Sequence, residues 1–463
     1  MRDRSPGFKL FLAGLVGLAL LIPLLLVYGL VSDRQEQARI AERAITAGSG
    51  GAQIVSGPVL VVPYDEARSI NDTVDGRMVT RTQRVRKELF LSPARHSLAT
   101  VLDPERKKKA LYETVIYIAK MQGKARFELP ADLATLGLTR DQLRLEQAQL
   151  RFGISDTRGL RAAANVRVNG RALALVPGGG LNASKGAGFS GPVVWTDGSA
   201  LAVDYSYTLR GSQSLTLVPR GGRTDWRVTS SWQHPDFGGS FLPDESRVSD
   251  KGFSASWSIG TIALNQPVAN LQDPGPPVLI DAPERMSYEA QQAAEERGTS
   301  KAASIGLIEP ADIYAQVDRS VKYGFLFIGF TFVTFLLFDV VGGARVAAAE
   351  YLLTGAGLVL FFVLLLAFAE WTGFGLAYVI ASAAIIGLLT AYSAAVLGGW
   401  KRASFIGVML TALYGVLYVL LSLEAASLIV GSLLMFMALA GVMYATRNVN
   451  WSEVTSREER FAD

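Results

Sequence analysis

The sequence predicts a membrane α-helical bundle of six transmembrane helices joined to a large β-rich, antiparallel sandwich-like domain. Of the 463 residues, 50% are hydrophobic and only 19% are charged, whereas soluble domains carry about 25% charged residues. The apolar residues gather in 10–31 and 324–446, and a bilayer core about 30 Å thick needs roughly 20 apolar residues of helix. Between these runs, 33–320 has the short alternating segments of a folded, water-soluble β domain.

The first apolar run, 10–31, is predicted to be an uncleaved signal anchor. It contains no charged residue, and a short basic tail, 1–9, precedes it. A cleavable signal peptide has a shorter apolar run and a small-x-small exit site, which the residues after 28 do not offer. Pro23 lies inside the run and is expected to kink the helix, which membrane helices tolerate.

Polar breaks divide the second apolar block into five more spans, so that 323–446 forms a five-helix transmembrane bundle. The breaks are short Gly-, Glu- or Arg-containing segments. The predicted spans are 323–341, 351–369, 374–397, 405–423 and 425–445.

Basic residues set the predicted orientation. With the N-terminus inside, the cytoplasmic segments are 1–9, 342–350, 398–404 and the C-terminal tail 447–463. They hold Arg2, Arg4, Lys9, Arg345, Lys401, Arg402, Arg447, Arg457 and Arg460. The short external loops around Glu370 and Glu424 hold no Lys or Arg. This positive-inside asymmetry predicts a bacterial inner-membrane protein with both termini in the cytoplasm and 32–322 in the periplasm.

The exported domain is predicted to begin with a helical extension at 33–45 and to continue in strands. Alternating or β-branched segments predict strands at 54–63, 111–118, 124–129, 145–154, 163–169, 201–209, 213–218, 224–232 and 253–259. Gln122-Gly123 is the predicted turn of a hairpin, and 177–192 is a Gly-rich loop. The stretch 268–306 is predicted to be a linker or surface excursion with a short helix at 287–297.

The sequence predicts no catalytic residue, cofactor or metal site. There is no cysteine, and the only histidines, His96 and His234, are far apart in the chain. No phosphate loop, dinucleotide fingerprint, zinc-protease motif or nucleophile elbow is present. The net charge of +4 does not predict a nucleic-acid partner, because no basic stripe alternates with aromatic residues. Lys107–Lys109 is interpreted as a solvated face or loop.

Three acidic residues are candidate intramembrane polar groups: Asp339, Glu370 and Glu424. Asp339 lies within an apolar run, and the other two lie at span boundaries. Charges near the midplane of a membrane mark ion or substrate pathways, and the spans have none there. The sequence therefore favours pairing of Asp339 with Arg345, or its reach to the interface, over a transport role. Small residues spaced four apart, such as Ala377 and Ala381, favour tight helix packing.

Several segments resemble the CreD family, inner-membrane proteins associated with cell-envelope integrity. The resemblance runs nearly from end to end, and it is carried by 57–64, 154–160, 209–212, 231–243, 252–257, 319–332 and 442–447, with Trp451 beyond. Asp339, Trp371 and Glu424-Ala425 differ from the residues expected in the family. The resemblance implies a role in envelope maintenance under a stress-responsive regulator, and it implies no catalytic residues.

The segment between the tryptophans at 232 and 257 carries the most specific part of the resemblance. Its candidate functional or structural residues are Trp232, His234, Pro235, Phe237, Gly238, Phe241, Pro243, Phe253 and Trp257. The restriction that proline places on the residue before it, together with the paired glycines, favours a core corner of the sheet over a ligand or peptidoglycan contact.

These observations favour a non-enzymatic inner-membrane protein that maintains envelope integrity and presents its periplasmic domain to an envelope protein or lipid. The lipid bilayer is the one partner that the sequence itself identifies. The alternatives are a transporter or permease component built on the six-helix bundle, and an envelope enzyme acting on glycan or lipid.

Overall fold

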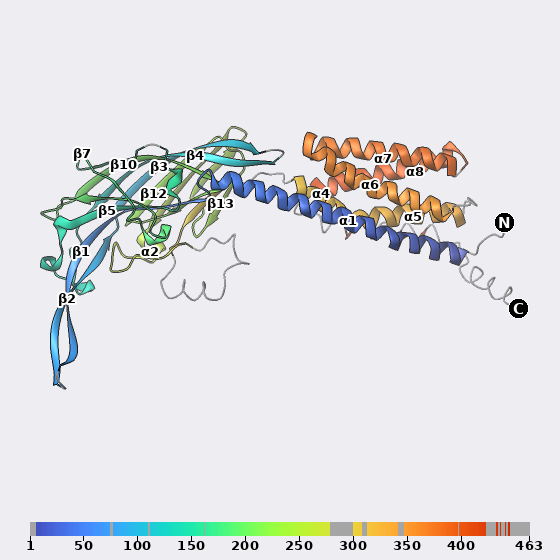
Figure 1. The fold of residues 1–463 in the computed structure, drawn as a ribbon. Helices are drawn as coiled ribbons and strands as arrows, with labels where there is room; N and C mark the ends of the chain where they lie inside the picture. Colours follow the sequence, from blue (N-terminus) through green and yellow to red (C-terminus); the bar gives the residue numbers. More distant parts are fainter. Residues whose placement is uncertain are drawn as a thin grey trace. The chain divides into compact units, whose positions relative to one another are not determined.

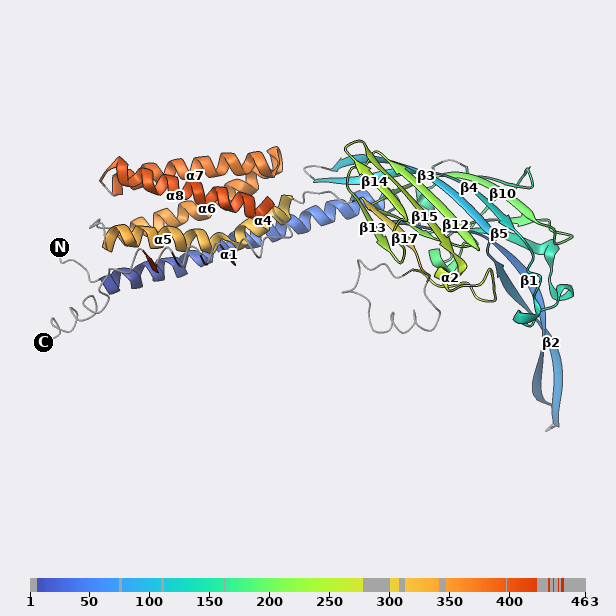
Figure 2. The same cartoon turned by 180° about the vertical axis from the view of Figure 1, so that it is seen from behind.

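The computed structural model describes residues 6–74, 77–109, 112–161, 163–277, 300–307, 313–340, 347–396 and 398–422, with 432–433, 436, 440 and 443–444. The chain divides into two compact units (Figures 1 and 2). One combines Met1–Arg39 with Ala311–Asp463, and the other is Ile40–Pro310. Each unit has its own hydrophobic core, so the chain is a helical unit into which a β-rich unit is inserted.

In its described residues, the helical unit contains α1 (Pro6–Ala47) up to Arg39, α4 (Ile313–Lys322), α5 (Gly324–Val340), α6 (Ala348–Thr372), α7 (Phe374–Val396) and α8 (Trp400–Ser422). Four of these are long and apolar enough to cross a bilayer: Phe11–Ala47, Ala348–Thr372, Phe374–Val396 and Trp400–Val419. The described part of α5 has 17 residues, at the lower end of the roughly 17–25 that span a bilayer. The predicted sixth span, 425–445, lies largely outside the described residues. The described part therefore supports four membrane-spanning helices rather than the six predicted.

Helix ends differ from the predicted span ends because hydropathy marks the membrane boundary and not the end of backbone hydrogen bonding. α8 begins at Trp400, so Lys401 and Arg402 lie in its first turn and not in a loop. α6 continues to Thr372 and stops at Gly373, whose φ is +79°. Glu370 consequently lies in the last turn of α6 rather than in an external loop.

α1 is one continuous helix of 42 residues that contains Pro23. At 1.5 Å per residue it is about 63 Å long, twice the thickness of a bilayer core. The predicted helical extension at 33–45 is confirmed, and it runs on to Ala47.

Small side chains bring α7 against its neighbours. Ala377, Ala381, Ile385 and Leu389, spaced four residues apart, are all buried. Ala383, Ala384 and Gly387 are exposed. Tyr378 donates a hydrogen bond of 2.7 Å to the carbonyl of Tyr414 on α8. The contact face of α7 is thus one narrow stripe.

The β unit contains two large sheets (Figure 1). The first has the order β13-β17-β11-β1-β5-β9-β8, with β2 beside β1 and β16 beside β2. Its strands are β1 (Gln53–Val74), β2 (Arg77–Leu91), β5 (Ala148–Ile154), β8 (Val176–Pro177), β9 (Gly188–Val193), β11 (Ser214–Val218), β13 (Pro235–Gly239), β16 (Ala269–Asn270) and β17 (Ala303–Leu307).

The second sheet has the order β14-β15-β12-β3-β4-β10-β6-β7. Its strands are β3 (Arg95–Lys109), β4 (Tyr112–Phe127), β6 (Asn165–Val168), β7 (Arg171–Ala172), β10 (Leu201–Ser212), β12 (Arg223–Ser230), β14 (Glu245–Ser249) and β15 (Gly252–Gly260). Both sheets are mixed, because β1 pairs with β11, and β12 with β3, in parallel. This corrects the purely antiparallel prediction: parallel partners need crossovers between distant segments, which local alternation does not encode.

The main core lies between the two sheets. β10 shows the alternation of a strand with one buried face, and its inward residues include Tyr205 and Tyr207. Phe152 on β5 packs edge-on against Tyr205 at 5.1 Å between ring centroids, and Phe189 on β9 meets Tyr207 at 6.0 Å. These contacts show that the sheets pack face to face as a sandwich.

β1 and β2 form a hairpin much longer than the sandwich. They pair from Leu60↔Leu91 to Val74↔Arg77, whereas β5 leaves β1 at Val61. The outer part of the hairpin extends away from the two sheets (Figure 1). The sequence predicted only the inner part of β1, and it did not predict β2.

Gln122-Gly123 lies in the middle of β4 and not in a turn, so the predicted hairpin at this point is wrong. Gly123 pairs across the sheet with Tyr205. A Cβ at this glycine would lie 2.2 Å from the Cζ atom of the Tyr205 ring. Glycine is present because an aromatic ring crosses the strand, a reason that sequence alone does not distinguish from a turn.

Two other predicted loops contain strands. β17 begins within the predicted linker 268–306 and pairs with both β11 and β13, and β9 begins in the predicted Gly-rich loop 177–192. Lys107–Lys109, interpreted as a solvated face or loop, are the last residues of β3, and Lys108 is exposed. The helix predicted at 287–297 lies outside the described residues.

Candidate functional site

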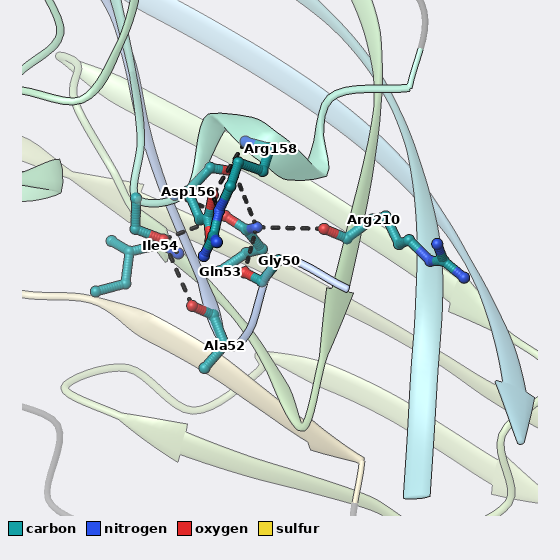
Figure 3. A network of polar contacts seen from close by, with 8 residues as sticks. Gly50, Ala52, Gln53, Ile54, Asp156, Arg158 and Arg210 are labelled. Carbon is teal, nitrogen blue, oxygen red and sulfur yellow. Dashed lines mark hydrogen bonds and ion pairs between the residues drawn. The ribbon is translucent and has the colours of Figure 1, made fainter. Parts of the chain in front are cut away.

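A buried polar network holds the start of β1, a few residues after α1, against the rest of the β unit (Figure 3). Gln53, the first residue of β1, is fully buried. Its Nε2 donates to the carbonyls of Gly50 (2.7 Å), Asp156 (3.1 Å) and Arg210 (3.2 Å). Its Oε1 accepts from the backbone N–H of Asp156 and from the hydroxyl of Ser155. One amide thus satisfies backbone groups from three distant segments, which a buried polar residue must do to be tolerated.

Gln213, in the turn between β10 and β11, contacts residues near both ends of the β unit. Gln213 has a φ of +64°, and its Nε2 donates to Oε1 of Glu42 on α1 at 2.8 Å. Its carbonyl accepts from the N–H of Leu307, the last residue of β17, at 2.7 Å. The incoming and outgoing chains are therefore fastened to the β unit at one residue.

A buried ion pair, Arg220–Asp273, lies beside β1 of the first sheet. Arg220 and Asp273, each with a side chain 4% exposed, are 2.5 Å apart. The Nε of Arg220 also donates to Ser56 on β1, and Asp273 accepts from the backbone N–H of Asn182. Burial lowers the pKa of Arg220, and the Asp273 carboxylate opposes that shift. The pair ties together four segments that are far apart in sequence.

His96 on β3 is buried, with 1% of its surface exposed. Its Nε2 lies 2.7 Å from the hydroxyl of Tyr205. Burial lowers the pKa of this imidazole to about 4, so it is neutral at ordinary pH. An imidazole enclosed in this way supports packing and not contact with a substrate.

The structure divides the candidate residues of the segment 232–257 between core and surface. Trp232, Phe253 and Trp257 are buried, and Trp257 stacks on Trp226 with ring centroids 4.6 Å apart. Pro235, Phe237, Gly238, Phe241 and Pro243 are partly buried, and His234 is exposed.

Backbone carbonyls hold the two outer tryptophans of this segment. The indole of Trp232 donates to the carbonyl of His234 at 2.9 Å, and that of Trp257 donates to the carbonyl of Phe241 at 3.1 Å. Trp226 donates to the hydroxyl of Thr100 at 3.0 Å. Each buried indole therefore has a hydrogen-bond acceptor, as a packed corner requires.

Within the described residues, no group of three or more His, Asp and Glu side chains has the arrangement of a metal site. His96 faces Tyr205, and His234 contributes its carbonyl to Trp232. The structure thus gives the two histidines separate surroundings and does not bring them together as a site.

Glu370 is the candidate intramembrane acid whose contacts the structure describes. Its side chain is 10% exposed and lies 3.8 Å from Nε of Arg34 on α1. The hydroxyl of Tyr314 on α4 lies 3.4 Å from the same carboxylate oxygen. The same two helices, α1 and α4, also meet where Lys322 lies over the ring of Tyr28. Glu370 thus joins α1, α4 and the end of α6, within the helical unit.

The other two acids cannot be placed in the same detail. Asp339 lies in α5, but its side chain falls outside the described part of the structure. Glu424 also lies outside the described residues.

The outer face of the second sheet carries a polar groove of about 430 Å³. Strand register places Lys124, Asp204 and Arg167 side by side on β4, β10 and β6. The next outward row holds Gln122, Ser206 and Asn165 on the same three strands. Lys124 and Asp204 are 3.9 Å apart. The groove could not be predicted from the sequence, because alternation indicates outward positions but strand register decides which of them are neighbours.

A protein-family model described as "Inner membrane protein CreD" matches residues 5–452. The chain belongs to the CreD family. It is 31% identical over 441 residues to the Inner membrane protein CreD of Escherichia coli (strain K12), covering 94% of this chain and 91% of that protein. The resemblance inferred from the sequence is therefore confirmed, and the chain is a multi-pass inner-membrane protein in contact with the lipid bilayer.

A crystal structure of a putative protease from Parabacteroides distasonis ATCC 8503 is similar to part of the chain. It shares 10% identity, covers 53% of this chain and 46% of that chain, and superposes with a TM-score of 0.19. A likeness this weak supports no conclusion about fold or activity.

Proposed function

We propose that this CreD family member is a non-enzymatic protein that maintains envelope integrity by holding its β unit in the periplasm, where that unit binds an envelope component. In this proposal the chain crosses the membrane six times with both termini in the cytoplasm. The spans would be the four long apolar helices, α5, and the segment 425–445.

The observation that carries the proposal is the packing, within the helical unit, of α1 against α4, the helices that precede and follow the inserted β unit. Tyr28 and Arg34 lie on α1, which precedes the β unit in the chain, and α4 follows that unit and precedes α5. Tyr28 contacts Lys322 of α4, and Arg34 shares Glu370 with Tyr314 of α4. Val27 and Val31 also share a core with Val317 and Val321. The entering and leaving chains therefore lie at the same end of the helical unit.

Charge distribution supports assigning that end to the periplasm. At the opposite end of α1, Arg2 and Arg4 precede the helix and Lys9 lies in its first turn, and Lys401 and Arg402 lie at the start of α8. Positive residues favour the cytoplasmic side of an inner membrane. A non-enzymatic role is supported by the enclosure of His96, whose neutral ring is hydrogen-bonded inside the sandwich.

The test uses single cysteines, because the natural chain has none. Ser254→Cys places a thiol on an exposed position of β15, and Lys401→Cys places one at the start of α8. In intact cells whose outer membrane has been made permeable, a membrane-impermeant maleimide should label Ser254→Cys. It should label Lys401→Cys only after the inner membrane is disrupted.

The integrity role is tested in a separate experiment, by deletion of the chain and complementation. Cells lacking the chain should admit more of a large antibiotic or dye than complemented cells, measured by its uptake. Labelling of Lys401→Cys in intact spheroplasts with protection of Ser254→Cys would reverse the topology. Identical dye uptake with and without the chain, under envelope stress, would remove the integrity role.

A further inference from the structure

We propose that the polar groove on the outer face of the second sheet binds a chain of N-acetylated amino sugars. This inference deepens the proposed function, because it names the class of envelope component that the β unit would bind. It rests on the groove itself, whose residues all lie within the β unit.

The groove is large enough for a short oligosaccharide. Its volume of about 430 Å³ falls within the range of about 300–1,000 Å³ found for small-molecule sites. Neighbouring outward residues lie on strands about 4.8 Å apart, so three strands present their side chains over about 10 Å. A rigid sheet holds these groups in fixed positions, which favours recognition over adaptable loops.

Two rows of side chains define the chemistry. The first row places the Asp204 carboxylate between the cations Lys124 and Arg167. The second row places the hydroxyl of Ser206 between the amides of Gln122 and Asn165. A carboxylate accepts hydrogen bonds, an amide both donates and accepts, and the cations donate. The surface therefore offers hydrogen-bond donors and acceptors within a few ångströms of each other. A ligand rich in hydroxyl groups needs both, because each hydroxyl donates and accepts.

The two amides indicate an acetamido group in particular. A side-chain amide can donate its N–H to an acetamido carbonyl and accept the acetamido N–H through its own oxygen. Gln122 and Asn165 lie on either side of Ser206, so each can meet one sugar of a chain. Of the groove residues, Tyr205 is the one aromatic, and its ring is directed into the core against Phe152. Stacking on a flat apolar ligand is thus disfavoured.

A simple anion fits less well than a sugar. Asp204 lies between the two cations and 3.9 Å from Lys124, so a phosphate bound by both cations would meet a carboxylate at the same place. The negative charges of the phosphate and of the Asp204 carboxylate would repel each other. The same carboxylate is an acceptor for sugar hydroxyls.

Purified full-length chain in lipid nanodiscs provides the test, with tetra-N-acetylchitotetraose as the probe and empty nanodiscs as the reference. Maltotetraose supplies hydroxyls without acetamido groups, and inorganic phosphate supplies the anion alone. Affinity is measured by calorimetry or by saturation-transfer NMR. Asp204→Ala and Gln122→Ala should each weaken chitotetraose binding about tenfold or more, because each removes hydrogen bonds to the ligand.

Lys120→Ala is the matched control for Lys124→Ala. Lys120 is exposed on the same face of β4, four residues away and outside the groove. Lys124→Ala should weaken binding, and Lys120→Ala should leave it unchanged. All four positions are exposed, so unfolding temperatures should match the natural chain and exclude loss of fold as the cause.

Three results would overturn the inference. They are no saturable binding of chitotetraose, binding that the Asp204 and Gln122 variants leave unchanged, and tighter binding of maltotetraose or phosphate than of chitotetraose. Because binding is measured on purified chain, it does not depend on sidedness. Binding without periplasmic labelling would reject the proposed function alone, whereas periplasmic labelling without binding would reject only the sugar site.

Discussion

At the scale of single residues, His96 shows what enclosure does to an ionisable group. The ring is fully buried against Tyr205, and burial lowers its pKa from 6.5 to about 4. The folded state therefore binds this proton less readily than the unfolded chain does. The free energy of unfolding is therefore highest above pH 6.5. Protonation of His96 lowers it as the pH falls toward 4, by on the order of 3 kcal/mol in total.

We expect the free energy of unfolding of the β unit to fall over this pH range in the natural chain. His96→Gln cannot titrate, so it should be less stable at pH 7 and should show a smaller fall. His234→Gln, at an exposed position, serves as the control and should behave like the natural chain. The free energy of unfolding is measured by urea unfolding of the full chain in nanodiscs, followed by tryptophan fluorescence, to which the stacked Trp226–Trp257 pair contributes. If the free energy of unfolding of His96→Gln falls as much as that of the natural chain, His96 is not the group responsible.

The same residues show which part of the site the sequence could not provide. Alternation predicted that 201–209 forms a strand, and β10 confirms it. It could not predict that Tyr205 crosses Gly123 to reach His96, since that contact depends on pairing between strands about 80 residues apart. The neighbours of Lys124, Asp204 and Arg167 are set by the same pairing, so the groove too was beyond the sequence pattern.

At the scale of elements, the Arg220–Asp273 pair fastens the segment before β12 to the one after β16. Both side chains are 4% exposed, and Asp273 also holds the backbone of Asn182. An ion pair removed from water is strongly destabilised when one partner is lost, because the other charge stays buried. Exposed pairs contribute little, typically less than 1 kcal/mol.

Asp273→Asn should therefore lower the free energy of unfolding of the β unit by about 3–5 kcal/mol. Asp225→Asn breaks the exposed Arg223–Asp225 pair, whose side chains are 64% and 46% exposed, and should cost less than about 1 kcal/mol. Thermal or urea unfolding of both variants and the natural chain gives the comparison. Equal losses in the two variants would show that the buried pair is not a fastening point.

Elements were predictable where one local signal decided them. Apolar length predicted α1, α6, α7 and α8, because lipid demands an uninterrupted helix. β17 was missed because it follows a Pro- and Ala-rich stretch, yet its alternating residues Ala303, Ile305 and Leu307 are buried in the sheet. β2 and β3 were missed because their Arg- and Lys-rich outer parts resemble loops. Pairing with a neighbouring strand, and not composition, makes these segments strands.

At the scale of the whole molecule, the chain enters the β unit once and leaves it once, and Gln213 contacts residues near both of these ends. Its side chain donates to Glu42 at the end of α1, and its carbonyl accepts from Leu307 at the end of β17. A non-glycine residue with a φ of +64° sits in a region that costs free energy. The side chain therefore has a role that glycine could not fill.

Gln213→Gly keeps this backbone conformation, which glycine adopts without strain, and removes only the bond to Glu42. We expect amides of residues 40–47 to exchange with deuterium several-fold faster, since the last turns of α1 lose a tertiary contact. Peptides from the middle of α1 and from β15 should be unchanged. Glu36→Gln, on the same helix at an exposed ion pair with Arg39, is the matched control and should leave 40–47 protected. If Gln213→Gly exchanges like the natural chain, the bond to Glu42 does not hold the end of α1, and the turn between β10 and β11 holds only the outgoing chain.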